Sequence, residues 1–111
     1  MPIAGVKFSF WVPLVSKMGT MANVNDYAQA FNEAVAAELV AYRAGARWTQ
    51  KQLIDATGIS KSKMIRIEAA RIDIGSRDIA LITDALGVEP HELMARATAR
   101  LEKARLANAD A

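Results

Sequence analysis

The sequence predicts an all-α fold, a compact bundle of five helices in which the first and last helices are extended. The composition supports this, because 52% of the residues are hydrophobic, many of them alanine, and only 6% are aromatic. Alanine is the strongest helix former. Apolar residues also recur three and four positions apart along much of the chain, which is the period of a helix with one buried side. Residues that begin or end helices stand between these periodic segments.

The first helix is expected to begin at Asn23 or Asn25, either of which can cap it, and to run to about Gly45. Its apolar residues recur at spacings of four and three and form one stripe: Tyr27, Phe31, Val35, Leu39 and Tyr42. The simplest use of this stripe is packing in the core, and a cofactor site or a dimer seam are the alternatives. The first two turns extend beyond a small core and are available to a partner subunit.

Two short helices joined by a sharp turn are expected between Trp48 and Arg71. The first begins at Thr49, which completes a reciprocal capping box with Gln52. It ends at Gly58, because glycine adopts the left-handed backbone without steric cost.

Ser60 caps the second of these two helices, in which apolar and polar residues lie on different sides. Met64 and Ile67 are three positions apart, so they share one face and anchor the helix to the body. Basic and hydroxyl side chains lie elsewhere on the helix: Lys61, Ser62, Lys63 and Arg66. A short helix with two apolar anchors and a basic face suits insertion into the major groove of DNA.

The fourth helix is expected from Arg77 to Leu86, after a loop in which Gly75 permits a turn. Ser76 can cap this helix, and Gly87 ends it. Its buried stripe consists of three residues: Ile79, Ile82 and Leu86.

The last helix begins at Pro90, because proline at the first helical position lacks only an N–H that would be unbonded in any case. Its apolar face is long and narrow: Leu93, Ala97, Leu101 and Ala104. The core of a compact domain does not extend this far. We therefore expect this face to pair with the same helix of a second subunit, and the alternative is an end that frays into solvent.

Three groups of residues in the central segment have the spacing of one known family: Thr49, Gln50 and Leu53; Gly58, Ile59 and Ser60; and Met64, Arg66, Ile67 and Glu68. They resemble the phage repressor and Cro type of helix-turn-helix family, over about Leu39 to Ala95. The resemblance implies a repressor-like bundle with its motif at residues 49–70. Two positions depart from the family pattern: Ile54 replaces the usual alanine, and Ala70 replaces a helix-ending glycine. The second departure suggests that the recognition helix ends less abruptly than usual.

The resemblance also implies roles for individual side chains. Three residues of the recognition helix match positions that touch base edges: Lys61, Ser62 and Arg66. Ile65 is apolar at a normally exposed position, where it meets either a thymine methyl group or the loop after Arg71. Contacts with phosphates or the groove are expected from six residues: Gln50, Lys51, Ser60, Lys63, Arg71 and Arg77. Lys63 has a base contact as its alternative. Arg43 and Glu68 match a buried ion pair of these repressors, and the alternative is two unrelated surface charges.

The distribution of charge is consistent with a nucleic-acid surface. The net charge is only +2, but residues 42–77 hold eight basic and three acidic side chains. From this we expect a sequence-specific regulator, a repressor that binds an inverted-repeat operator of double-stranded DNA as a homodimer. The alternatives are an antitoxin-type autoregulator that also binds a toxin protein, and an interaction module that has lost DNA binding.

Other function classes find little support in the sequence. The chain has no cysteine and one histidine, so we expect no disulfide framework and no metal site. It has no paired catalytic carboxylates, no nucleophile with a histidine and acid partner, and no Gly-rich phosphate loop. We therefore expect no enzyme activity, no cofactor and no small-molecule ligand. No segment is long enough to span a membrane, and we expect a cytoplasmic protein.

The two ends of the chain are expected to be the least structured parts. A leader covers residues 1–22, in which apolar residues alternate with polar ones from Val6 to Val12, the period of a short strand, until Pro13. It is a flexible segment, a segment that packs on the body or a partner chain, or an arm that touches DNA. The helix-turn-helix domain covers residues 23–107, and a disordered tail is expected at 108–111.

Overall fold

The computed structural model describes residues 24–110, which form five helices and no strand. In chain order these are α2 (Val24–Gly45), α3 (Gln50–Thr57), α4 (Lys61–Glu68), α5 (Ser76–Leu86) and α6 (Pro90–Asp110). The prediction of an all-α bundle of five helices with long first and last members is confirmed. The expectations for the leader at 1–22 and for a cap at residue 23 fall outside the described residues.

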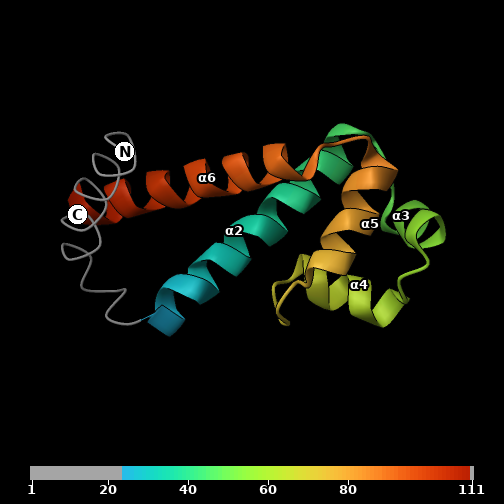
Figure 1. The fold of residues 1–111 in the computed structure, drawn as a ribbon, viewed down its shortest axis with the longest axis horizontal. Helices are drawn as coiled ribbons and strands as arrows, with labels where there is room; N and C mark the ends of the chain where they lie inside the picture. Colours follow the sequence, from blue (N-terminus) through green and yellow to red (C-terminus); the bar gives the residue numbers. More distant parts are fainter. Residues whose placement is uncertain (1–23, 111) are drawn as a thin grey trace, which may run out of the picture.

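The five helices form a long pair and a short trio (Figure 1). α2 and α6 pack against each other, and α3, α4 and α5 gather where the C-terminal end of α2 meets the N-terminal end of α6. All five helices contribute to one core, whose fully buried members include Leu39, Leu53, Met64, Ile67, Ile82 and Leu93. The stripe on α2 is part of this core, since Val35 is 2% exposed and Tyr27, Phe31 and Tyr42 pack partly buried against it.

The apolar face of α6 packs against α2 of the same chain. Leu93, Ala97 and Leu101 are at most 4% exposed and belong to the core. The expectation that this face pairs with a second subunit is therefore wrong for these residues, because α2 is long enough to cover them. An ion pair adds to the same contact, with 2.7 Å between Glu38 Oε2 and Arg100 Nη2.

A second polar contact between α2 and α6 lies nearer to the short trio. The Tyr42 hydroxyl donates a hydrogen bond of 3.0 Å to Glu92 Oε2, and the Arg96 guanidinium lies 5.4 Å from the centre of the Tyr42 ring. Desolvation and the hydrogen bond to Glu92 raise the pKa of the Tyr42 phenol above its usual value. The hydroxyl therefore remains a donor throughout the neutral pH range.

The end of α6 extends further than expected. The helix includes residues 108–110, which were expected to be a disordered tail, and Ala111 lies outside the described residues. The physical reason is visible in the sequence, because no glycine or proline follows Pro90 and so no residue forces the helix to end earlier.

The start of α5 also differs from the expectation. Ser76 is the first helical residue rather than the cap, and Gly75 is the N-cap with no side-chain hydrogen bond. The Gly75 carbonyl accepts the first helical hydrogen bond from the Ile79 N–H at 3.0 Å. The Ser76 hydroxyl thus lies one position too late to cap the helix. Asp78 occupies the first turn, where a carboxylate is favoured by the helix dipole.

The end of α4 is abrupt, contrary to the expectation drawn from Ala70. Ala70 has a φ of 56° and donates to the Ile67 carbonyl at 3.0 Å, while Arg71 donates to the Arg66 carbonyl at 2.8 Å. These two hydrogen bonds form a Schellman motif. An alanine completes it although a Cβ in this conformation costs roughly 1–2 kcal/mol. Arg47 has the same conformation after α2, with a φ of 60°.

Candidate nucleic-acid interface

The turn between α3 and α4 has the caps that the sequence predicts. Thr49 Oγ1 accepts from the Gln52 N–H at 3.1 Å, and Gln52 Oε1 accepts from the Thr49 N–H at 2.7 Å. Gly58 ends α3 with a φ of 76°. Ile59 is 6% exposed and fills the turn, and the Ser60 hydroxyl then caps α4. Together these contacts set the direction in which α4 leaves the turn.

α4 has a buried side, an exposed side and two flanks, because successive residues are about 100° apart on a helix. Met64 and Ile67 lie on the buried side and are fully inaccessible. The opposite side carries three exposed residues: Ser62, Ile65 and Arg66. Lys63 lies on one flank and Glu68 on the other. Lys61 is exposed in the first turn.

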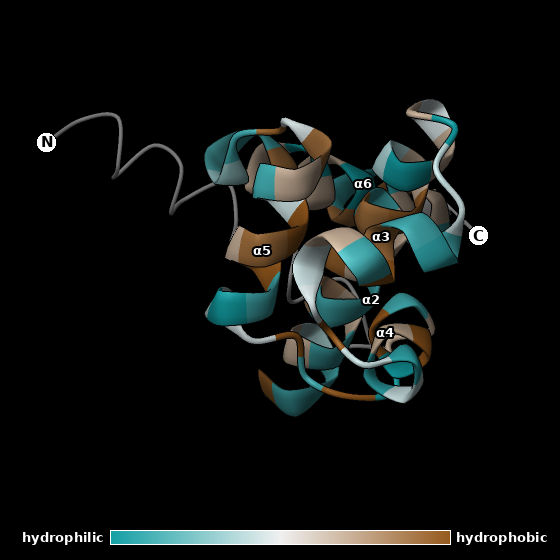
Figure 2. Cartoon of the chain, turned by 90° about the vertical axis from the view of Figure 1, so that its right-hand side faces the viewer, coloured by the Kyte–Doolittle hydropathy of each residue, from teal (hydrophilic) through white to brown (hydrophobic). Residues whose placement is uncertain are grey.

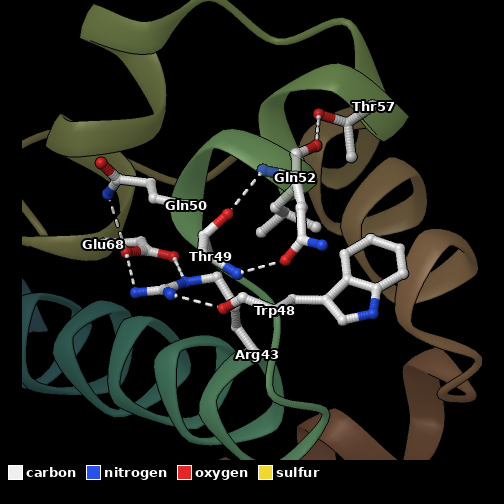
Figure 3. Close-up of polar contacts among 8 residues, drawn as sticks. Arg43, Trp48, Thr49, Gln50, Gln52, Thr57 and Glu68 are labelled. Carbon is white, nitrogen blue, oxygen red and sulfur yellow. Dashed lines mark hydrogen bonds and ion pairs between the residues drawn. The ribbon is translucent and has the colours of Figure 1, made fainter.

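Glu68 connects its flank of α4 to α2 and α3 (Figure 3). Arg43 donates two hydrogen bonds to this carboxylate, from Nε at 2.7 Å and from Nη2 at 3.1 Å. Gln50 Nε2 donates a third, at 2.9 Å. Arg43 Nη1 also donates to the Trp48 carbonyl at 2.9 Å. The ion pair that the resemblance implies is therefore present, and Gln50 is an additional member of it.

Lys63 connects the other flank of α4 to α5. Its Nζ lies 2.9 Å from Asp78 Oδ2, and the Asp78 side chain is only 8% exposed. Asp78 was not singled out in the sequence, where its only signal is an acidic residue in the first turn of a helix. That signal is common on surface helices, since the helix dipole favours it everywhere. The contact partner, 15 positions away along the chain, is visible only in the folded protein.

The side chains expected to read bases are all on the surface. Figure 2 looks onto the end of the molecule that carries α3 and α4, and hydrophilic and hydrophobic residues alternate along both helices. Lys61, Ser62, Ile65 and Arg66 are exposed, and so are Ser60, Arg71 and Arg77. Four of these are cations with no carboxylate partner within residues 24–110: Lys61, Arg66, Arg71 and Arg77. Lys51 differs, because it pairs with Asp55 at 2.9 Å on the exposed side of α3.

This surface offers positive charge and hydrogen-bond donors. In the part of the chain that the structure describes, no group of three or more His, Asp or Glu side chains is placed to hold a metal ion. None of the described helices is long and apolar enough to cross a membrane. The exposed donors around α4 suit an anionic partner, and their spacing on one short helix suits the edges of stacked base pairs.

Comparison with known proteins identifies the family to which these helices belong. Residues 34–97, more than half of the chain, match the family model described as a helix-turn-helix domain. The match begins within α2, includes α3, α4 and α5, and ends within α6. Searches of curated proteins and of solved structures gave no match.

Proposed function

We propose that this chain, which belongs to the helix-turn-helix domain family, is a sequence-specific DNA-binding regulator that inserts α4 into the major groove. The observation that carries this proposal is the state of α4. Its apolar side is fully buried, both flanks are tied to neighbouring helices by ion pairs, and its basic side is exposed. A helix held in this way presents its side chains to base edges at low entropic cost, since little freedom is left to lose on binding.

The exposed side of α4 is proposed to read the sequence. Arg66 can donate two hydrogen bonds to guanine O6 and N7, a contact worth about 1–3 kcal/mol of discrimination. Ser62 and Lys61 are proposed to contact neighbouring base edges. Ile65 is 44% exposed, which supports a contact with a thymine methyl group rather than burial under the following loop.

Other exposed residues are proposed to position the protein on the DNA backbone. Gln50 uses one N–H of its amide for Glu68, so the second N–H is available for a phosphate at the N-terminus of α3. The remaining contacts are assigned to Lys51, Ser60, Arg71 and Arg77. Lys51 reaches a phosphate by exchanging its exposed partner Asp55, which costs little because exposed ion pairs are weak.

The protein is proposed to act as a homodimer on an inverted-repeat operator, most simply as a repressor. One recognition helix covers only half of a typical operator, and useful affinity normally requires two half-sites about one DNA turn apart. Leu93, Ala97 and Leu101 of α6 are buried within the chain, which supports a dimer surface that does not include them.

An antitoxin-type regulator is the second candidate function. The observation that favours it is exposed apolar surface away from the DNA face, at Val24 near the start of α2 and Leu106 near the end of α6, which are 80% and 51% exposed. A toxin that docks on these two helix ends would bury both side chains. A toxin encoded beside this protein that binds it directly with a defined stoichiometry would support this function.

Selection of bound sequences from random double-stranded DNA tests the main proposal. We expect an enriched inverted repeat, and its symmetry reports the number of subunits. In a mobility-shift assay, binding to the enriched site should weaken steeply as the salt concentration increases. No enrichment, together with no salt-sensitive shift of any duplex, would refute DNA binding.

A further inference from the structure

The pairing of Lys63 with Asp78 divides the cations of α4 into two kinds. Lys61 and Arg66 are exposed and have no carboxylate partner within the described residues. Lys63 is half-exposed, and its ammonium group lies 2.9 Å from Asp78 Oδ2. The helix therefore presents two uncompensated cations rather than the three that its sequence carries.

The burial of Asp78 makes this pairing more durable than an ordinary surface ion pair. Only 8% of the Asp78 side chain is exposed, whereas both members of the Lys51–Asp55 pair are more than half exposed. A carboxylate removed from water strongly retains a cationic partner, because losing it would leave an uncompensated buried charge. A DNA phosphate that took Lys63 from Asp78 would leave the buried Asp78 carboxylate without its cationic partner.

We propose that Asp78 is a positioning residue, which holds the charge of Lys63 away from the DNA backbone and so limits the sequence-independent part of the binding. This inference rests on the proposed function. Phosphate contacts strengthen binding to all duplexes alike, whereas base contacts separate one sequence from another. By withholding one cation from the backbone, Asp78 lowers the salt-dependent affinity for every duplex and leaves the readers Arg66 and Ser62 undisturbed.

The position of the pair on α4 supports this role. Lys63 lies on the flank that faces α5, opposite to the Glu68 flank, so neither member is on the side that would enter the groove. Asp78 itself is a positioning residue, because it acts on DNA only through Lys63. Its effect should therefore appear in the salt dependence of binding rather than in the preferred sequence.

The test compares four variants of the full chain on the selected operator and on a scrambled duplex, from 50 to 200 mM salt. Asp78→Asn releases Lys63 and keeps the shape of the side chain. Asp84→Asn is the matched control, since it removes an exposed carboxylate from the same helix and releases no lysine. Lys63→Gln and the double variant D78N/K63Q complete the set. Circular dichroism at the assay temperature gives the folded fraction by which each affinity is corrected.

We expect Asp78→Asn to steepen the slope of log affinity against log salt by about 0.9, one additional phosphate. Over the fourfold salt range this is roughly a 3.5-fold greater loss of affinity than in the parent. Binding at 50 mM salt should increase by a similar factor on the scrambled duplex and on the operator, because a phosphate contact does not depend on sequence. Lys63→Gln, D78N/K63Q and Asp84→Asn should all keep the parental slope.

Three results would overturn the inference. Equal slopes for Asp78→Asn and Asp84→Asn would mean that Lys63 is not released. A slope that becomes shallower by one phosphate in Lys63→Gln would mean that Lys63 already contacts the backbone. In both cases the parent still binds its operator, so the proposed function stands. A parent that binds no duplex removes both proposals together.

Discussion

The ion pair between Arg43 and Glu68 leads to the sharpest prediction about stability. In Glu68→Ala, Arg43 loses two hydrogen bonds and its only carboxylate partner within residues 24–110, and Gln50 loses its acceptor. The two charged side chains are 19% and 9% exposed, so water compensates the loss only in part. Removal of one member of a buried pair costs about 3–5 kcal/mol. Arg43 keeps its bond to the Trp48 carbonyl, so we expect the lower end of this range.

A loss of about 3 kcal/mol is large for a domain of this size, whose total stability is about 5–15 kcal/mol. Thermal unfolding followed by circular dichroism should show a midpoint lowered by roughly 12–24 °C. Glu68→Gln should lose less, because the amide oxygen still accepts a hydrogen bond. Glu33→Ala is the control, since Glu33 is exposed and, within the described part of the chain, accepts a hydrogen bond from Gln29 alone, one turn away.

One result would contradict the structural role of Glu68. If Glu68→Ala unfolds within a few degrees of the parent but no longer binds DNA, Glu68 acts at the interface and not in the fold. If it unfolds early, its loss of binding should disappear at temperatures where the variant is still folded.

Three further predictions concern single positions. Ala70→Gly should stabilise the protein by about 1 kcal/mol in urea unfolding, because glycine adopts the left-handed conformation of this residue without strain; a decrease in stability would contradict the Schellman geometry. Gly45→Ala should stabilise by about 0.5–1 kcal/mol, since it lies in the last turn of α2 and an added Cβ meets no atom within 4 Å; an unchanged midpoint would mean that this turn is frayed. Arg66→Ala should lose about 1–3 kcal/mol of binding free energy on the cognate site alone. Lys51→Ala should weaken binding to all duplexes and flatten the slope of log affinity against log salt by about 0.9. If both variants lose the same affinity on cognate and on scrambled DNA, Arg66 is not a base reader.

Much of the fold follows from short stretches of sequence. The capping box at Thr49, the left-handed Gly58 and the cap at Ser60 each involve residues no more than four positions apart, and all three are present in the structure. The burial of Met64 and Ile67 follows from helical spacing in the same way. These features depend on local geometry, which is why inspection of the sequence finds them.

Helix-capping preferences did not predict the helix ends correctly at two places, the start of α5 and the end of α4. Ser76 is a good capping residue, but it is the first residue of α5, and Gly75 takes the N-cap position before it. Ala70 lacks the freedom of glycine, but it still adopts the left-handed conformation, and two backbone hydrogen bonds close the end of α4 there. The conformation of Ala70 opposes a residue preference of about 1–2 kcal/mol, whereas glycine replaces serine as a cap at a cost of only a few tenths of a kcal/mol.

The amino-acid sequence by itself determined the helical class, the helix boundaries to within a few residues, and the set of basic and hydroxyl side chains carried by α4. Only the tertiary structure decided that α2 covers the apolar face of α6, and that Lys63 is engaged by Asp78 while Arg66 has no such partner among residues 24–110. The reason is physical. Helix propensity and capping act over a few residues, whereas ion pairs and core contacts depend on which helices meet, and that is settled by burial of apolar surface across the whole chain.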